Sequence, residues 1–316
     1  MGRWIGRIAL AVAVVAAIGA IYGYQRVRTV ESERLTDDVH VLFGLGGNVG
    51  VLRTDRGSVI VDTMTFRMQG DRIRERAEAL TGREVAVILN THYHRDHTHG
   101  NPAFPAGTRI VATQRTRELL EAFDADSWRG DASRTLPNET FEGSYEIALG
   151  GKTVRALQPG RGHTSGDLVA LFVEDRVLHA GDLFFNGRYP NVDLEAGGSI
   201  EQWIATLDRL LALDGYDRVI PGHGPVSDRE GLRRFQAFLR ELWDKASAAA
   251  RAGASLEDTL RTTSLTTDAG YESIGVPFVY RIDKPLVIRR AWEEATGRVR
   301  PIGPAAADGA GGGAGR

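Results

Sequence analysis

The segment from residue 91 to residue 101 constrains this chain more than any other, because it contains four of the chain's eight histidines, all between positions 92 and 99. Residues 85–89, just upstream, form a short apolar run rich in β-branched side chains, which predicts a buried strand. In α/β sheets, ligands collect at the carboxyl ends of strands. The segment therefore predicts a metal site at the end of a strand.

The composition excludes several other kinds of site. The chain has 316 residues and no cysteine, which rules out disulfides, thiolate zinc sites and cysteine nucleophiles. A hydrophobic content of 42% and a charged content of 25% are ordinary for a globular protein. The length allows one large domain, or a domain with an appendage. The net charge is -2 and no basic stripe stands out, so no nucleic-acid partner is expected.

The N-terminal segment has the pattern of a membrane anchor or an export signal. Arg3 and Arg7 precede an uncharged run at residues 8–24, and Arg26 and Arg28 follow it. This length is the short limit for a membrane-spanning helix and slightly long for a signal-peptide core. We favour an uncleaved anchor over a cleaved signal, and either over a buried helix of a soluble protein. In both favoured cases we expect an exported protein on the periplasmic or extracellular side.

Beyond a polar linker that ends near residue 36, turn signals divide the chain into two similar halves. The first half is expected to contain strands at 39–43, 48–53, 58–62, 85–89 and 108–112, with helices at 67–80 and 113–123. The second is expected to contain strands at 145–149, 153–157, 168–173, 176–180 and 218–220, with helices at 199–213, 229–251, 256–262 and 284–295. Strands followed by helices in each half favour an α/β (four-layer α+β) fold, with two mixed sheets face to face and helices outside.

The same patterns divide the chain into four parts. Residues 1–36 are the anchor or signal with its linker, and residues 37–240 are the domain that carries the histidine cluster. Residues 241–300 are a helical C-terminal extension. Residues 301–316 are mostly Gly and Ala, a composition that predicts disorder.

The histidine cluster offers ligands in two directions. His92 and His94 are two residues apart in an extended segment, so their side chains point the same way and can reach one ion. Asp96 and His97 follow at the turn into the next element. We expect them to point toward a second position.

Three further candidates stand beside glycines at the predicted ends of strands in the second half. They are His163, Asp182 and His223. Glycine allows the backbone to approach closely at such positions, so these loops can bring their side chains toward the cluster.

Together these motifs resemble those of the metallo-β-lactamase fold superfamily over about residues 38–240. They are Asp62, His92-x-His94-x-Asp96-His97, Gly162-His163-Thr164, Gly181-Asp182 and Gly222-His223-Gly224. The resemblance implies an αββα sandwich with two metal ions between the sheet edges. It implies that His92, His94 and His163 bind one ion, that Asp96, His97 and His223 bind the other, and that Asp182 bridges both. Asp62 is expected to support the ligands without binding metal.

Neutral imidazoles and carboxylates are good ligands for zinc, and also for iron or manganese. Two such divalent ions can hold a hydroxide and polarise a carbonyl or phosphoryl oxygen. In that scheme Asp96 orients the hydroxide and can accept a proton. Of the other histidines, His99 is expected to be exposed or capping, His179 packed or supporting, and His40 structural.

The position of Asp182 favours one branch of the superfamily. The resemblance implies cysteine or serine there in true zinc β-lactamases, and a bridging aspartate in glyoxalase II-like hydrolases, lactonases and phosphodiesterases. We therefore expect a dinuclear zinc hydrolase of an ester, thioester or lactone, acting on a small molecule. The alternatives are a mononuclear iron sulfur dioxygenase, a β-lactamase or phosphodiesterase of the same fold, and a binding protein with a structural metal.

The segment that follows Asp182 is expected to line the substrate pocket through Arg188 and Tyr189. Arg188 either holds an anionic group of the substrate or pairs with Asp193. The sequence leaves open the substrate, the metal, the cleavage of the N-terminal segment, the oligomeric state and the role of the C-terminal helices.

Overall fold

A computed structural model describes residues 22–276 and 280–299, together with residues 7, 14, 17 and 19. Most of the predicted anchor at residues 8–24, and the whole tail at 301–316, lie outside the described residues. Residues 22–28 are helical. Among the described residues, no helix is both long enough and apolar enough to cross a membrane.

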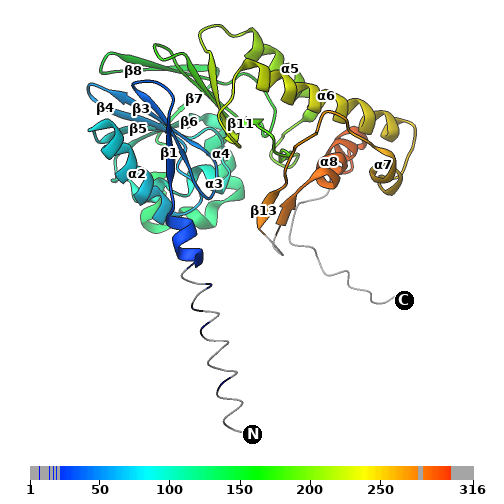
Figure 1. The fold of residues 1–316 in the computed structure, drawn as a ribbon, viewed down its shortest axis with the longest axis horizontal. Coiled ribbons are helices and arrows are strands. Elements are labelled where there is room, and N and C mark those ends of the chain that lie inside the picture. Colours follow the sequence, from blue (N-terminus) through cyan, green and yellow to red (C-terminus); the bar gives the residue numbers. More distant parts are fainter. Residues whose placement is uncertain are drawn as a thin grey trace.

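Two mixed sheets form the centre of the molecule (Figure 1). The seven strands of the first sheet lie in sequence order, antiparallel from β1 to β4 and parallel from β4 to β7. They are β1 (Glu31–Arg34), β2 (Val39–Phe43), β3 (Val49–Thr54), β4 (Gly57–Val61), β5 (Val85–Leu89), β6 (Arg109–Thr113) and β7 (Glu139–Phe141).

The second sheet has the strand order β12-β11-β10-β9-β8, with only β11 and β12 parallel. Its strands are β8 (Ser144–Leu149), β9 (Lys152–Leu157), β10 (Val169–Phe172), β11 (Val177–Phe185) and β12 (Arg218–His223). A separate hairpin joins β13 (Ile274–Val276) to β14 (Tyr280–Ile282).

Helices cover the outer faces of both sheets. The first sheet carries α2 (Arg67–Thr81) and α4 (Gln114–Phe123), and the second carries α5 (Ile200–Ala212) and α6 (Arg229–Arg251). The one-turn helix α3 (Arg95–Thr98) follows β5. The C-terminal part adds α7 (Leu256–Thr262) and α8 (Lys284–Thr296). Short 3-10 helices occupy η1 (Asn101–Ala103), η2 (Ala125–Trp128) and η3 (Gly130–Thr135).

Strand β4 shows why the chain folds into four layers. All five of its residues are buried. Val59 and Val61 point between the sheets, into a core shared with Phe172 of β10, whereas Ile60 points outward onto Ile73 of α2. Because successive side chains of a strand face opposite sides, a continuously apolar strand needs cover on both faces. The predicted αββα sandwich is confirmed.

The predicted elements differ most from the structure at the β13–β14 hairpin, where no strand was expected, and at three further places. Strand β11 runs on to Phe185, so Asp182 lies within a strand instead of in the loop that we expected. Residues 25–36 were expected to be a linker, but they include the end of a helix and strand β1. All four β1 residues are exposed, and an edge strand with no buried face leaves no hydrophobic pattern to detect. The third is β7, a short strand in a stretch that we expected to be irregular.

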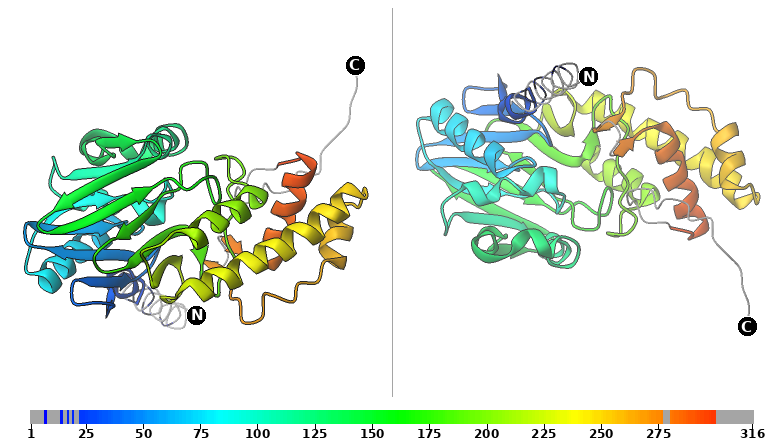
Figure 2. Two further views of the ribbon diagram at one scale, coloured as in Figure 1. Left: turned by 90° about the horizontal axis from the view of Figure 1, so that it is seen from above. Right: turned by 90° about the horizontal axis from the view of Figure 1, so that it is seen from below.

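The C-terminal helices pack onto the sheet domain through one shared core. Helix α6 continues across the predicted boundary at residues 240 and 241 and carries α7 and α8 (Figure 2). Val287 and Ala291 of α8 share a buried cluster with Trp203 of α5. Glu294 also accepts hydrogen bonds from Ser199 Oγ at 2.6 Å and from the backbone N–H of Ile200 at 2.7 Å. A carboxylate of α8 therefore caps the N-terminus of α5.

Replacing Glu294 with alanine should lower the stability of the whole domain. The substitution leaves the first-turn donors of α5 without their charged partner, at a cost of about 1–2 kcal/mol. Thermal unfolding measured by circular dichroism checks this. Glu201→Ala, in the first turn of the same helix, is the control and should unfold within about 0.5 kcal/mol of the parent protein. A shift no larger than in that control would mean that α8 does not stabilise α5 in this way.

Candidate metal centre

The seven predicted ligands lie in two adjacent groups, although they come from distant parts of the chain. The ligand atoms of His92, His94, His163 and Asp182 all lie within 4.8 Å of one another, and those of Asp96, His97 and His223 do the same. The segments are the end of β5, the one-turn helix α3, the loop before β10, strand β11 and the end of β12. The structure thus brings together every residue that the sequence predicted as a ligand.

Three imidazoles of the first group converge on one point. Nδ1 of His94 lies 3.1 Å from Nε2 of His92 and 2.8 Å from Nε2 of His163. His92 and His163 are completely or almost completely buried. The rings stand nearly perpendicular to one another, so the nitrogen atoms meet edge to edge without stacking.

Asp182 lies between the two groups and turns one oxygen toward each. Its Oδ2 is 3.5 Å from Nε2 of His163 and 3.9 Å from Nε2 of His92. Its Oδ1 is 3.2 Å from Nε2 of His97 and 3.4 Å from Nε2 of His223. This division of the two oxygens is the geometry that a bridging carboxylate requires.

The second group is completed by Asp96, which is the most exposed of the seven. Its Oδ2 lies 3.3 Å from Nε2 of His223 and 3.7 Å from Nε2 of His97. About 34% of its side chain is open to solvent, against 3% for Asp182. Asp96 is therefore the acidic group of the site that an entering molecule meets first.

Hydrogen bonds behind the rings orient four of the five imidazoles. His97 Nδ1 bonds to Asp62 Oδ2 at 2.7 Å, and His163 Nδ1 bonds to the carbonyl oxygen of Asn191 at 2.8 Å. Both partners only accept, so each Nδ1 carries the proton and each Nε2 presents its lone pair to the centre.

His94 and His92 follow the same rule. His94 Nε2 donates to Asp193 Oδ2 at 2.9 Å, which leaves Nδ1 facing the centre. Thr91 Oγ1 donates to Asp62 at 2.7 Å and therefore accepts from His92 Nδ1 at 3.0 Å. Asp62, which is fully buried, thus orients both His92 and His97.

Lone pairs directed at one another inside a buried site repel unless a cation lies between them. Nε2 of His97 and Oδ1 of Asp182 are also buried without a hydrogen-bond partner in the described part of the chain. Nitrogen and carboxylate donors in such a set suit zinc, manganese or iron. The residues therefore fit a pair of divalent metal ions.

Burial and charge act in opposite directions on the ring pKa values. Burial lowers the pKa of His92 well below its ordinary value and that of His163 to about 4. Burial also opposes a charge on His97 and His223, but the neighbouring carboxylates outweigh it and raise the pKa of His223 to about 9. The acidic side of the centre thus attracts positive charge, whether as protons or as metal.

Two glycines let the backbone pass close to the ligands. A Cβ atom at residue 222 would lie 1.9 Å from Asp182 Oδ1, and one at residue 47 would lie 2.2 Å from the ring of His97. Either side chain would displace a ligand. Gly222 therefore belongs to its motif for a steric reason.

Comparison with known proteins identifies the family. The family model described as the metallo-beta-lactamase superfamily matches residues 42–223, more than half of the chain. The chain belongs to the metallo-β-lactamase superfamily.

Its relatives include enzymes of two kinds. It is 26% identical over 181 residues to a type 2 metallo-beta-lactamase of Bacillus sp. (strain 170), covering 57% of this chain and 67% of the relative. It is 29% identical over 205 residues to a hydroxyacylglutathione hydrolase of Methylococcus capsulatus, covering 60% and 71%. The fold matches a metallo-beta-lactamase from Pontibacter korlensis with a TM-score of 0.58 and 22% identity, over 67% of this chain and 99% of that one. The chain is a metallo-hydrolase.

Outside the seven residues, two of the three remaining histidines of this superfamily member have ordinary hydrogen-bond partners, and the buried Nδ1 of His40 has none among the described residues. His99 Nε2 bonds to Asp124 Oδ2 at 2.6 Å. His179 is buried, with its Nε2 3.2 Å from the carbonyl oxygen of Asn48. His40, in β2, is half-buried. None of the three is in either ligand group.

The expected pocket residues have their polar ends occupied elsewhere. Arg188 forms an ion pair with Glu272, so the pairing with Asp193 that we considered is wrong. Tyr189 is buried and its hydroxyl donates to Asp268 at 2.7 Å. Their contact with substrate stays a prediction.

Asp193 is a residue of the site whose role the sequence did not reveal. Besides orienting His94, it accepts a hydrogen bond from the hydroxyl of Tyr93, and it is buried. It follows Asp182 by eleven positions in an irregular loop, where no spacing rule connects it to a histidine. Only its three-dimensional position shows its role.

Removing the Asp193 carboxylate should weaken metal binding without unfolding the protein. In Asp193→Ala, His94 loses the partner that fixes its tautomer, so we expect about a 10- to 100-fold loss of metal affinity. Competition with a coloured chelator measures it. Tyr93→Phe removes only the phenol hydroxyl and should change the affinity less than about threefold. Equal effects in the two variants would contradict the proposed role.

Proposed function

We propose that this protein is a dinuclear, zinc-dependent hydrolase of an ester, thioester or lactone. The single observation that supports this proposal most is the division of the Asp182 oxygens between two groups of imidazoles. A site for one ion would need only one of these groups. Two ions held by one carboxylate can activate water and polarise a carbonyl group when they are bound.

The side chains around the centre supply the remaining requirements of hydrolysis. Burial raises the pKa of Asp96, but the charges of His97 and His223 and the hydrogen bond to His223 lower it by more. The net pKa of Asp96 is therefore below its ordinary value. Asp96 is therefore ionised, and its partly exposed carboxylate can accept a hydrogen bond from a water molecule and orient it. The buried histidines exclude bulk water from the other side.

The C-terminal part contacts the loop that follows β11. Glu272 exchanges backbone hydrogen bonds with Gly187 and Tyr189, just after β11. The β13–β14 hairpin follows and presents Tyr280, which is 50% exposed. Burial, and then the charge of Asp96, raise the pKa of the Tyr280 phenol, so this ring lies within electrostatic reach of the centre. We propose that Tyr280 contacts the substrate.

β-Lactam hydrolysis is the second candidate, because several similar proteins are metallo-beta-lactamases. The aspartate at position 182 favours the first proposal over it, by the resemblance given above. An iron-dependent sulfur dioxygenase would use a single ion in the first group. Metal content and substrate range therefore distinguish the three.

The test combines metal analysis with a hydrolysis panel. We expect protein purified without added metal to contain about two zinc ions per chain. We expect it to hydrolyse thioesters or lactones faster than β-lactams and phosphodiesters. One iron and no zinc would contradict the hydrolase proposal. A β-lactam as the best substrate would contradict the ester, thioester or lactone class.

We also propose that the protein is exported and anchored by its N-terminal segment. The support is the uncharged run at residues 8–24 between pairs of arginines. Mass spectrometry of the mature N-terminus should find residues 8–24 retained. A mature chain that begins beyond residue 24 would show that the segment is a cleaved signal.

A further inference from the structure

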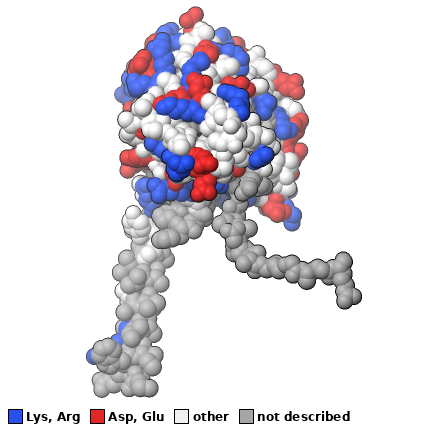
Figure 3. All heavy atoms as spheres, turned by 90° about the vertical axis from the view of Figure 1, so that its right-hand side faces the viewer, with Lys and Arg blue, Asp and Glu red and all other residues white. Residues whose placement is uncertain are grey.

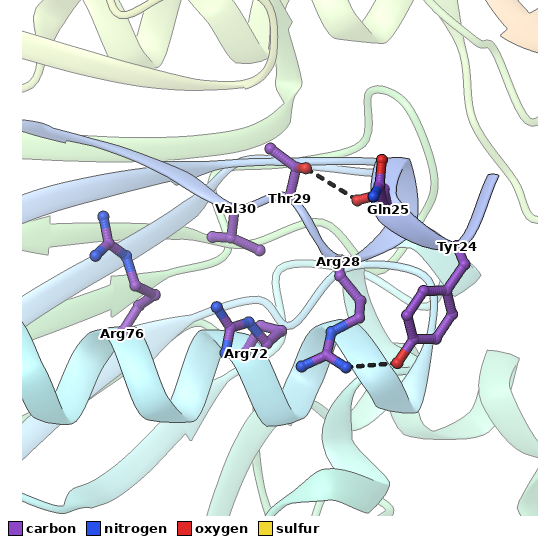
Figure 4. Close-up of a pocket in the computed structure, with 7 residues that line it drawn as sticks. All are labelled: Tyr24, Gln25, Arg28, Thr29, Val30, Arg72 and Arg76. Atoms are coloured by element: carbon purple, nitrogen blue, oxygen red, sulfur yellow. Dashed lines mark hydrogen bonds between the residues drawn. The ribbon is translucent and has the colours of Figure 1, made fainter. Parts of the chain in front are cut away.

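A basic pocket lies where the N-terminal helix meets α2, and none of the metal-centre residues lines it (Figure 4). Its volume is about 620 Å³. Residues 24–25 and 28–30 form one side, and Arg72 and Arg76 of α2 form the other. Figure 4 shows Arg28 directed toward α2 beside Arg72, with Arg76 one turn further along the helix. Three guanidinium groups from two segments therefore meet in one cavity.

Little negative charge compensates these three arginines. Among the described residues, only Arg72 has a carboxylate partner, which is Glu75. Arg28 donates to the hydroxyl of Tyr24 at 2.5 Å, and Arg76 donates to Ser32 Oγ at 3.1 Å. Both of these partners are neutral, so the pocket keeps an excess of positive charge.

Two of the guanidinium groups also have unused donors. Nε of Arg72 and Nε of Arg76 are buried and have no hydrogen-bond partner in the described part of the chain. A buried donor without a partner reduces stability. Four residues apart, the two side chains share one face of α2. Guanidinium groups so arranged match the oxygens of a phosphate group.

The two segments that form this pocket also carry exposed apolar and aromatic side chains. Tyr22 and Tyr24 are 69% and 50% exposed, and Phe66 and Met68 at the N-terminal end of α2 are 45% and 37% exposed. In Figure 4, Tyr24 lies toward that same end of α2. By contrast, the face of the molecule in Figure 3 mixes acidic and basic side chains. Aromatic rings next to arginines are typical of the boundary between a bilayer and water.

We propose that this pocket binds the phosphate group of an anionic phospholipid. Tyr24, the last residue of the uncharged run at residues 8–24, lines the pocket. This inference rests on the membrane anchor proposed above, which would hold the three arginines at the depth of the lipid headgroups. The shared chemistry is that of a phosphate oxyanion, and free inorganic phosphate is the other source of it. The bound lipid would fix the orientation of the domain above the membrane.

Isothermal titration calorimetry on the full chain in a neutral detergent tests the proposal. The titrants are short-chain phosphatidylglycerol, short-chain phosphatidylcholine and inorganic phosphate. The variant Arg72→Gln/Arg76→Gln removes two charges from the pocket. The control Arg74→Gln/Arg115→Gln removes two charges from outside it, since neither residue lines the cavity. Thermal unfolding of each variant shows whether it remains folded.

We expect phosphatidylglycerol to bind the parent chain and the control alike, and the pocket variant about tenfold or more weakly. Phosphatidylcholine should not bind detectably. Equal affinity in the pocket variant and the control would overturn the proposal, and so would equal binding of both lipids. Phosphate that binds as tightly as phosphatidylglycerol would overturn the lipid source. If the double variant unfolds, Arg28→Gln replaces it, because Arg28 is exposed and bonds only to Tyr24 among the described residues.

Discussion

Asp182→Asn should abolish hydrolysis while leaving the fold in place. The amide keeps the shape of the side chain but removes the negative charge and turns a donor toward one group of imidazoles. At least one metal position then loses a ligand, so we expect a fall in kcat of about 10²- to 10³-fold or more. Atomic absorption should find the metal content reduced from about two ions per chain to one or fewer.

The control for this result is Asp208→Asn, which makes the same chemical change at an exposed residue that bonds to Arg240 on the surface. It should retain full activity and full metal content. An Asp182→Asn protein that keeps both ions and loses less than about tenfold in kcat would contradict the bridging role. The oxygens of Asp182 would then serve only to balance charge.

Asp62→Asn should reduce both stability and metal affinity, although residue 62 faces no metal. The carboxylate accepts from the Thr91 backbone and hydroxyl and from His97. An amide nitrogen in place of Oδ2 would meet two donors, and His97 could avoid it only by changing tautomer and placing a proton on Nε2. We expect about 2–3 kcal/mol lower stability and a 10- to 100-fold loss of metal affinity.

Asparagine is the informative replacement because Asp62 has a positive φ of 68°. Asparagine tolerates this left-handed region, whereas alanine would add backbone strain to the lost hydrogen bonds. Urea unfolding in a chelator measures the stability without metal, and chelator competition measures the affinity. Asp38→Asn, at a partly exposed ion pair, is the control. If Asp62→Asn matches it in both measurements, Asp62 has no orienting role.

The sequence predicts the ligands well because each ligand motif is local. His92 and His94 follow a strand whose apolar pattern is plain, and His223 ends another. The sequence also predicted Asp182 as a ligand, but it did not predict that Asp182 lies within a strand. Gly181 adopts a φ of 50°, and the pairing of β11 with β12 shifts register there. Such an irregularity lets the strand continue past the aspartate. No periodic pattern marks it.

What the sequence could not show are contacts between segments that carry no common motif. The Asp193 carboxylate reaches back 99 positions to His94, and Glu294 reaches back 95 to Ser199. Both depend on how loops and helices dock after the sheets have formed. Strand β1 was not predicted for another reason. Its residues are all exposed, and backbone pairing with β2 holds them in place. Hydrophobic patterns in the sequence indicate which side chains are apolar and buried. They do not indicate polar contacts between distant segments or an exposed edge strand.

The scattered origin of the ligands has a consequence for the lifetime of the protein. With no cysteine, no disulfide can join distant segments. A cation held by His94 and His163 would join positions 69 residues apart, and closing a loop of that size restricts the unfolded chain as a cross-link does. Loss of metal would then do more than stop turnover, since it would open the chain to proteases. A shortage of metal would therefore lower the amount of this protein as well as its activity.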